Sequence, residues 1–259
     1  MKMTVDINCD MGESFGAYEI GRDKEVIRYI TSANIACGFH ASDPNVMKET
    51  VRLCHEHCVM VGAHPGYPDL EGFGRRHIDV SPSELINYVI YQVGALRGFS
   101  SLFGLSLQHV KMHGALYNDL VNKEDLFFEI ITAVKKAFGD IIFFTLATQR
   151  TAELRKKWKR KGLRLALEAF PDRNYTNEGE LLSRKHAEAV LKDQDAIAER
   201  AVIMVKNKGI KSVDGRWIKL DVDTLCIHGD NPESIRAAKK IRAAFEKAGI
   251  NVCPPADFL

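Results

Sequence analysis

The sequence predicts an α/β fold: a single domain over residues 1–259 that forms an incomplete, seven-stranded (β/α) barrel of the TIM type. Two observations favour this fold. Seven short apolar runs alternate with helix-forming stretches, which is typical of parallel strands joined by crossover helices. Six of the seven runs carry an acidic residue or a histidine at or within two residues of their C-terminal end. So many polar strand ends converge more easily at the mouth of a closed barrel than along an open sheet.

The first predicted strand, Val5–Asp10, carries a polar side chain at every second position: Asp6, Asn8 and Asp10. Parallel strands usually have two apolar faces, so a polar face indicates a barrel interior whose mouth is an active site. The other predicted strands are short apolar runs next to turn or helix signals: Ala33–His40, Val59–His64, Leu107–His113, Ile141–Leu146, Leu163–Phe170 and Asp223–His228.

Helices are predicted between these strands from apolar spacing and from start and stop signals. The clearest signal is Ser81-Pro82-Ser83-Glu84, a capping box with proline at the first helical position. A hairpin with Asp214-Gly215 at its turn is predicted around Val213–Lys219. The predicted helices are Asp23–Ile30, Pro44–His57, Pro82–Phe103, Glu124–Phe138, Gln149–Lys161, Gln194–Lys208 and Pro232–Gly249.

Composition excludes several classes of function. The net charge of +2 gives no overall field for nucleic acid or an anionic membrane. No apolar stretch approaches the length of a membrane span, and the N-terminus has no signal-peptide pattern. Six cysteines without a signal peptide are expected to be reduced thiols. We therefore expect a cytoplasmic protein.

The candidate site lies at the ends of the predicted strands. After the third strand comes a glycine- and proline-rich loop up to Arg76 that no packing requirement explains, and such loops usually carry function. Lys111 should point into the barrel, where a buried lysine needs an anionic partner or a chemical role. The groups that could act as general acids, general bases or metal ligands are Asp10, Glu13, His40, His64, His113 and His228.

Three other patterns are interpreted as ordinary structure. In Cys54–Cys58, the two histidines would lie on opposite sides of a helix, so we expect no metal there. The basic run Arg155–Arg164 is interpreted as a solvated helix face. No G-x-x-x-x-G-K-[ST] motif is present, so no P-loop accounts for nucleotide binding.

Six stretches resemble the LamB/YcsF family and follow one another along nearly the whole chain. Met112 and Pro171 depart from the family pattern, which more usually has Pro and Ala there, and neither replaces a group that could do chemistry. The matching stretches are Asp6–Gly16 (DINCDMGESFG), Ser32–Pro44 (SANIACGFHASDP), Gly62–Arg76 (GAHPGYPDLEGFGRR), Val110–Asn118 (VKMHGALYN), Glu168–Tyr175 (EAFPDRNY) and Cys226–Pro232 (CIHGDNP).

The resemblance implies a barrel of the glycoside hydrolase/deacetylase type. It also implies cleavage of 5-oxo-L-proline to L-glutamate, coupled to ATP hydrolysis, in a complex with subunits B and C. Because the chain has no evident nucleotide cradle, our hypothesis is that the partners phosphorylate the lactam oxygen and this subunit opens the ring.

In this hypothesis Asp10, Glu13 or His64 activates water, and Lys111 with Arg75 holds the developing anion. His113 or His228 then protonates the leaving amine. The predicted catalytic residues are Asp10, Glu13, His64, Lys111, His113 and His228. The predicted substrate-binding residues are Asn8, His40, Arg75, Glu168, Arg173 and Asp230.

Two alternatives remain open from the sequence. One is metal-dependent deacetylation or amide hydrolysis of a carbohydrate or small amide, with Asp10, His64 and His228 holding a divalent ion. The other is a non-catalytic module that binds a sugar or metabolite.

Overall fold

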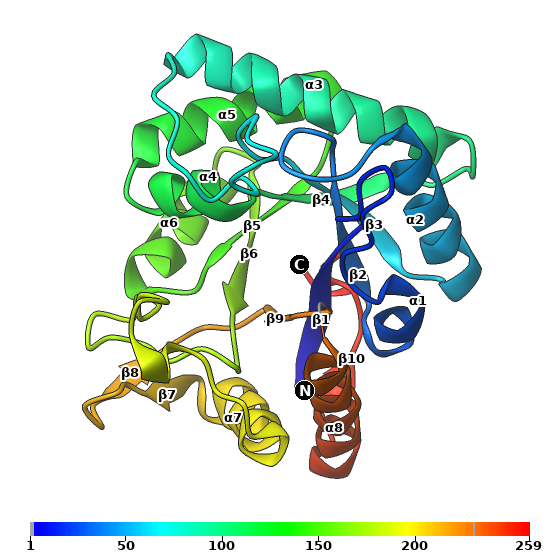
Figure 1. Ribbon diagram of the computed structural model, residues 1–259. Helices are drawn as coiled ribbons and strands as arrows, with labels where there is room; N and C mark the ends of the chain where they lie inside the picture. Colours follow the sequence, from blue (N-terminus) through cyan, green and yellow to red (C-terminus); the bar gives the residue numbers. More distant parts are fainter. Residues whose placement is uncertain (1–2, 230) are drawn as a thin grey trace.

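The computed structural model describes residues 3–229 and 231–259 and confirms the barrel (Figure 1). Among these residues, seven parallel strands pair in sequence order, and β1 also pairs with β9, which closes the ring. The strands of the ring are β1 (Thr4–Met11), β2 (Ser32–Ala36), β3 (Met60–His64), β4 (Leu107–Lys111), β5 (Ile142–Leu146), β6 (Arg164–Ala169) and β9 (Thr224–Ile227).

Helices surround the outside of this ring (Figure 1). The predicted capping box forms, since Ser81 accepts from the Glu84 amide and the Glu84 carboxylate accepts from the Ser81 amide. No helix within the described parts of the chain is long and apolar enough to cross a membrane. The helices are α1 (Asp23–Val26), α2 (Pro44–His57), α3 (Pro82–Ser101), α4 (Gly114–Val121), α5 (Glu124–Phe138), α6 (Gln149–Lys159), α7 (Gln194–Asn207) and α8 (Pro232–Ala248).

Two predicted strands were too long at their C-terminal ends. β2 ends at Ala36 because the chain turns at Gly38, which has φ of +91° and donates its amide to the Ala41 carbonyl. His40 therefore lies in a loop. β4 ends at Lys111, and His113 is the N-cap of α4, a helix that was not predicted.

Three short strands lie outside the ring. β7 (Gly209–Lys211) and β8 (Trp217–Lys219) form the predicted hairpin. β10 (Asn251–Val252) was not predicted, and it pairs in parallel with the start of β1.

Polar side chains fill much of the barrel interior, as the alternation in the first strand predicted. Asn8 donates to Glu168 at 3.0 Å and to Thr224 at 2.7 Å, and Asn34 donates to Asn8 at 2.7 Å. These four side chains are completely buried, and each hydrogen bond joins different strands. The interior network therefore fixes the side chains beneath the mouth of the barrel.

One close approach inside the barrel requires a glycine. A Cβ on Gly62 would lie 2.1 Å from Nε2 of His109. The His109 ring stacks on Phe144 with centroids 4.1 Å apart, and its Nε2 is 2.7 Å from Oδ1 of Asn34. Gly62 thus leaves the space that the imidazole occupies.

Candidate active site at the barrel mouth

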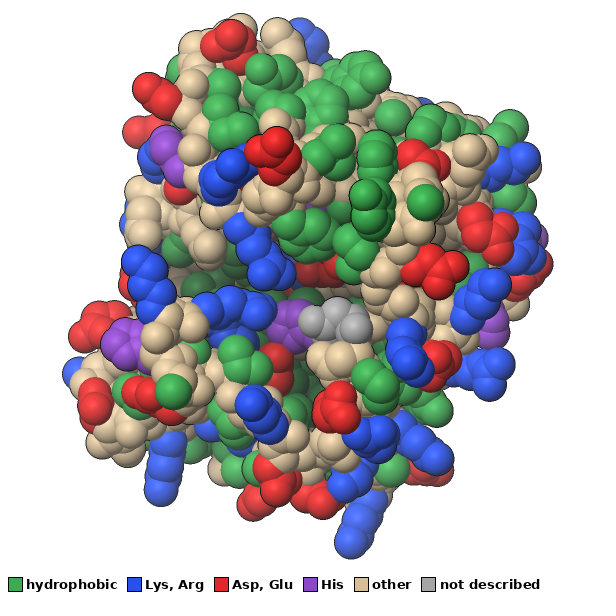
Figure 2. All heavy atoms as spheres, in the orientation of Figure 1, with side chains coloured by type: hydrophobic (Ala, Val, Ile, Leu, Met, Phe, Trp, Pro, Cys, Tyr) green, Lys and Arg blue, Asp and Glu red, His purple; other side chains and the backbone are tan. Residues whose placement is uncertain are grey.

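A cavity of about 820 Å³ opens at the C-terminal ends of the strands, where enzymes with this fold place their chemistry. Figure 2 shows a recess on one face of the molecule with basic and histidine side chains around it. Eight of the predicted site residues line the cavity: Asp10, Glu13, His64, Arg75, Lys111, His113, Arg173 and His228. The predicted convergence of strand ends is therefore observed.

Lys111 extends from the end of β4 into the barrel and is almost completely buried. Its Nζ lies 2.8 Å from Oδ1 of Asp10 and 3.0 Å from Oε1 of Glu168. Burial alone would lower the pKa of Lys111, but the charges of Asp10 and Glu168 outweigh it and hold the pKa well above its usual value. The lysine is therefore a fixed cation below the mouth.

His64 and His113 each direct one ring nitrogen at a backbone carbonyl. Nδ1 of His64 is 2.7 Å from the Lys111 oxygen, and Nε2 of His113 is 2.8 Å from the Phe73 oxygen. A carbonyl only accepts, so these two nitrogens carry the protons. The other nitrogens, Nε2 of His64 and Nδ1 of His113, lie 2.9 Å apart. Burial lowers the pKa of His113 to about 3, so its ring is neutral.

His40 lies beside this pair, although the β2–α2 loop carries it rather than a strand end. Its ring stacks on that of His113 with centroids 3.7 Å apart and an interplanar angle of 3°. His40 is 1% exposed, and neither of its ring nitrogens has a hydrogen-bond partner among the described residues. Such an orphaned imidazole is unusual in a folded protein.

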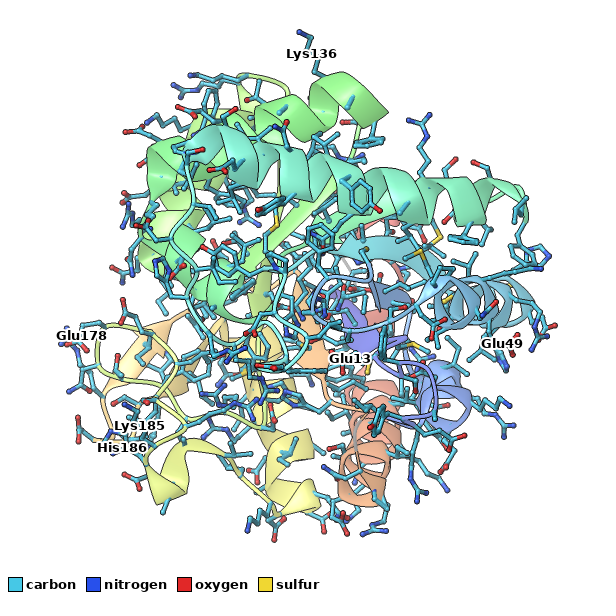
Figure 3. All side chains as sticks on the ribbon, turned by 45° about the horizontal axis from the view of Figure 1, so that its top comes forward. Glu13, Glu49, Lys136, Glu178, Lys185 and His186 are labelled. Atoms are coloured by element: carbon cyan, nitrogen blue, oxygen red, sulfur yellow. The ribbon has the colours of Figure 1, made fainter. Side chains whose placement is uncertain are left out.

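Glu13 approaches the histidines from the loop after β1. Figure 3 shows it near the centre of the molecule, whereas Glu49 and Lys136 point outward. Burial, with the charges of Asp10 and Asp23, raises the pKa of Glu13 to about 8. A carboxyl group with a pKa near neutrality can both accept and donate a proton under physiological conditions.

His228 lies in the same cavity but has different partners. Its Nδ1 is 2.7 Å from Oδ2 of Asp172, and its Nε2 is 3.4 Å from a terminal nitrogen of Arg184. The charge of Asp172 raises the pKa of His228 above its usual value despite burial. Among the described residues, the clustered side chains that could jointly hold a metal ion are Glu13, His40, His64 and His113, and His228 is not one of them.

The predicted substrate-binding residues fall into two groups. Arg75 and Arg173 line the cavity. Asn8, His40 and Glu168 are buried behind its wall, so they contact other side chains of the site instead. Asp230 lies outside the described residues.

A family model described as the LamB/YcsF family matches residues 5–259. The chain belongs to the LamB/YcsF family. It is 49% identical over 257 residues to a Pyrococcus horikoshii protein whose name designates it the A subunit of 5-oxoprolinase. That match covers 99% of this chain and 100% of the relative. The resemblance predicted from the motifs is thus confirmed.

Two solved structures place the LamB/YcsF chain among known barrels. A lactam utilization protein from Thermus thermophilus has a TM-score of 0.89 and 41% identity, with 97% of this chain and 99% of that chain covered. A family 4 carbohydrate esterase from Streptomyces lividans has a TM-score of 0.50 at 10% identity, covering 98% and 94%. The second likeness concerns the fold alone.

Two residues of this LamB/YcsF site were missed by sequence reasoning. Tyr117 lies in a family stretch on α4, and its hydroxyl donates to Oε2 of Glu168 at 2.9 Å. Arg184 lines the cavity from the long segment after β6. The motif around Tyr117 was a usable signal, but nothing in the sequence around Arg184 distinguishes it from a surface arginine.

The two stretches interpreted as ordinary structure, Cys54–Cys58 and Arg155–Arg164, each contain both exposed and buried side chains. In Cys54–Cys58, His55 and His57 are exposed while Cys54 is buried, and the cluster is not among the groups that could bind a metal within the described chain. On α6, Lys157 is exposed, whereas Arg155 forms an ion pair with Asp223 at 2.5 Å.

Proposed function

We propose that this chain is the A subunit of a 5-oxoprolinase and that it hydrolyses the ring amide of 5-oxo-L-proline to give L-glutamate. The observation that carries the proposal is the full-length relationship, at 49% identity, to a protein of that name. The similarity to a lactam utilization protein over 97% of the chain supports it, since 5-oxoproline is a five-membered lactam.

Hydrolysis of a lactam needs three kinds of group. Water adds to the ring carbonyl carbon after losing a proton, the oxygen becomes an anion, and the carbon–nitrogen bond breaks as the nitrogen gains a proton. The products are a carboxylate and an amine on one open chain. The site must therefore supply a proton acceptor, a fixed cation and a proton donor.

We assign the proton acceptor to Glu13, because its pKa of about 8 makes it a stronger base than a free carboxylate. Asp10 suits this role less well. Despite burial, the neighbouring His64 and Lys111 hold the pKa of Asp10 well below its usual value, so it is a weak base. Lys111 provides the fixed cation for the developing oxyanion.

We assign the proton donor to His228 rather than His113. The pKa of His228 is raised by Asp172, which favours the protonated ring. Burial lowers the pKa of His113 to about 3, and its N–H already donates to the Phe73 carbonyl. A neutral ring held in this way is a poor donor to a leaving amine.

The substrate carboxylate needs a cationic partner, and we assign it to the arginines at the mouth. Arg75, Arg173 and Arg184 all line the cavity. Arg75 lies over the Phe73 ring, 5.3 Å from its centroid, and its guanidinium has no hydrogen bond to a described residue. Guanidinium groups bind carboxylates in two-point contacts, so a free arginine here suits an anionic substrate.

We further propose that ATP is consumed in a cytoplasmic complex with subunits B and C, which transfer the terminal phosphoryl group of ATP to the lactam oxygen and release ADP. On this chain, water then adds to the ring carbon, the carbon–nitrogen bond breaks to leave an acyl phosphate on the open chain, and a second water releases phosphate from it. The missing P-loop motif supports this division of labour. The name of the Pyrococcus relative designates one subunit of an enzyme, which implies an assembly. The six free cysteines fit a reducing compartment.

The test is an assay of glutamate formation from 5-oxo-L-proline by the purified chain, with and without ATP and with and without subunits B and C. Turnover is expected only with all three subunits and ATP, with one ADP formed for each glutamate. Turnover by this chain and ATP alone would contradict the division of labour. No turnover by the complete complex would contradict the function itself.

A second candidate is metal-dependent hydrolysis of an acyclic amide, such as the acetamide of an amino sugar. The close grouping of Glu13, His40, His64 and His113 favours it, since imidazoles and a carboxylate are ligands of catalytic metal ions. Release of acetate from N-acetylglucosamine by the isolated chain, without ATP, would favour this candidate over the first.

A further inference from the structure

Nε2 of His64 and Nδ1 of His113 face each other across the site at 2.9 Å, while the other nitrogen of each ring donates to a backbone carbonyl, that of Lys111 or Phe73. When neither ring carries a second proton, the facing nitrogens present lone pairs to each other. Two lone pairs at this distance repel. The arrangement is stable only when a cation lies against both nitrogens.

A carboxylate oxygen completes this group of acceptors. Oδ1 of Asp10 accepts from Lys111 and from Asn34, each at 2.8 Å, which fixes the orientation of the carboxylate. Its other oxygen, Oδ2, then lies 3.4 Å from Nε2 of His64. Oδ2 of Asp10, from β1, and Nδ1 of His113, at the start of α4, therefore both lie close to Nε2 of His64, from β3.

The surroundings match those of histidines that bind metal ions. Such histidines usually donate their remote N–H to a carbonyl or carboxylate, and ligating carboxylates are themselves hydrogen-bonded. His64, His113 and Asp10 all meet this description.

We propose that this site binds one divalent transition-metal ion through Nε2 of His64, Nδ1 of His113 and Oδ2 of Asp10. Two imidazoles and one carboxylate favour ions such as Zn²⁺, Mn²⁺ or Co²⁺ over Mg²⁺ and Ca²⁺, which prefer oxygen ligands. The inference goes beyond the proposed hydrolysis, because ion binding is measured without substrate.

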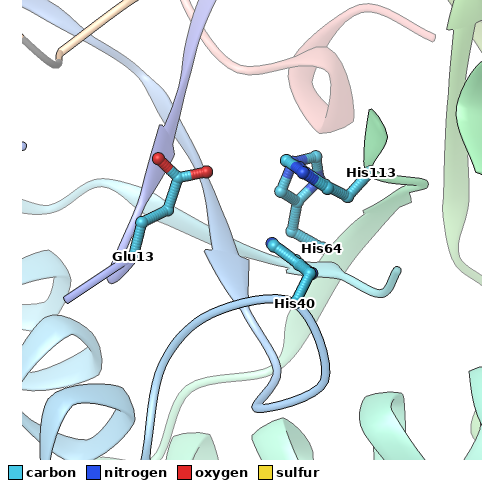
Figure 4. A group of neighbouring side chains, drawn as sticks. All are labelled: Glu13, His40, His64 and His113. Carbon is cyan, nitrogen blue, oxygen red and sulfur yellow. The ribbon is translucent and has the colours of Figure 1, made fainter. Parts of the chain in front are cut away.

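Ring geometry excludes His40 from the ligand set in its present orientation. One potential ligand atom from each of Glu13, His40, His64 and His113 lies within 4.8 Å of the others (Figure 4). However, the His40 and His113 rings are parallel, so an ion in the plane of one ring lies outside the plane of the other. The planes of His64 and His113 cross at 89°, which lets both face one ion.

Glu13 faces the same space without belonging to the ligand set. Figure 4 shows its side chain across an open space from the three histidines. Unlike Asp10, its carboxylate receives no hydrogen bond from a described residue, so nothing fixes it as a ligand. It keeps the role of proton acceptor assigned above.

The experiment is a calorimetric titration of the chelator-treated full chain with Zn²⁺, Mn²⁺ and Mg²⁺, followed by metal analysis after dialysis. We expect saturation at one Zn²⁺ or Mn²⁺ per chain and no saturable binding of Mg²⁺. His113→Ala should weaken ion binding by more than about 100-fold. Removing a residue that hydrogen-bonds to a ligand lowers metal affinity by about 10–100-fold, and removing the ligand itself should lower it further. Glu13→Gln should bind as the parent does.

His77→Ala is the matched control, because His77 is an exposed histidine that pairs with Asp119 outside this group. If thermal unfolding shows that His113→Ala does not fold, Asp10→Asn, which keeps the side-chain size, replaces it with the same expectation. Absence of saturable binding of both Zn²⁺ and Mn²⁺ would overturn the proposal. The proposal would also be overturned if the ligand variants bound the ion as tightly as the parent does. A nitrogen NMR spectrum that shows a proton shared between the His64 and His113 rings, and that does not change when Zn²⁺ is added, would overturn it too.

The outcomes separate this inference from the proposed function. A chain that binds the ion but shows no 5-oxoproline turnover in the complete complex retains the metal site and loses the function. Full turnover by the chelated complex, with metal analysis showing no ion, retains the function and overturns the site.

Discussion

The ammonium of Lys111 lies 2.8 Å from a carboxylate oxygen of Asp10, and both groups sit inside a barrel whose interior is largely polar. Lys111→Met keeps the side-chain length and removes the charge. Asp10 and Glu168 would then be two anions without their shared cation. Breaking a buried pair in this way costs about 3–5 kcal/mol of unfolding free energy, measured by urea unfolding.

The same variant should reduce glutamate formation by the complete complex at least ~100-fold, the typical effect of removing one oxyanion-stabilising group. Lys157→Met is the matched control, because Lys157 is an exposed lysine paired with Glu124 on the surface. It should change neither stability nor activity. A Lys111→Met protein with parental activity would rule out the assigned role.

Gly62→Ala should destabilise the protein. The new methyl group would lie 2.1 Å from Nε2 of His109, whose ring is held by Phe144 and Asn34 and has little room to move. Overpacking of this kind costs about 1–3 kcal/mol. Gly98→Ala on α3 is the contrast, since a Cβ there meets nothing within 4 Å and should stabilise the helix by about 0.5–1 kcal/mol. Denaturant unfolding of both variants tests the pair.

Asp6 should make stability depend on pH. Burial raises its pKa from 3.8 to about 6, although hydrogen bonds from Thr224, Thr31 and Ser32 oppose the shift. For a carboxyl with a raised folded-state pKa, the stabilising contribution is complete below about pH 4 and is lost as the pH rises through about 6.

Asp6→Asn removes this titration. The fall in unfolding free energy between pH 4 and pH 7 should therefore be smaller in the variant than in the parent, by roughly 3 kcal/mol for a shift of about two pKa units. Asp140→Asn, at an exposed aspartate paired with Arg164, should leave the pH profile unchanged. Parallel profiles for Asp6→Asn and the parent would contradict the assignment.

Arg75→Gln tests the binding of the substrate carboxylate. Because the Arg75 guanidinium lies over the Phe73 ring and forms no hydrogen bond to a described residue, the variant should fold normally. Loss of a charge-assisted hydrogen bond should raise the KM for 5-oxo-L-proline about tenfold or more, with kcat little changed. 2-Pyrrolidinone lacks the carboxylate and should show no such penalty. Arg52→Gln on α2 is the control, and a KM unchanged by Arg75→Gln would reject the contact.

Much of the barrel could be predicted because periodicity and turn signals are local properties of the chain. The errors in the predicted strand ends and helices occurred where the backbone conformation is not set by a local sequence pattern. The alternation of side chains predicted a second strand that continues to His40. In the structure β2 ends at Ala36, because Gly38 has a left-handed backbone conformation. α4 was missed because its N-cap, His113, makes no side-chain capping bond.

The candidate site was predictable as a set of residues but not as a set of contacts. Strand ends predicted that Asp10, His64 and Lys111 would meet. Lys111 also pairs with Glu168. This contact depends on the diameter of the barrel and on side-chain rotamers, and neither can be predicted from the spacing of residues in the sequence. The contact between His64 and His113 depends on which nitrogen each ring directs at a carbonyl, and this emerges only in three dimensions.

The pairing of β1 has a consequence for synthesis of the protein. One edge of this first strand is satisfied by β9, with Asp6 opposite Thr224. During translation, that edge stays open until nearly the whole chain has left the ribosome, and an open strand edge invites aggregation. A nascent chain stalled before β9 should therefore depend on chaperones, although most of its sequence has already been made.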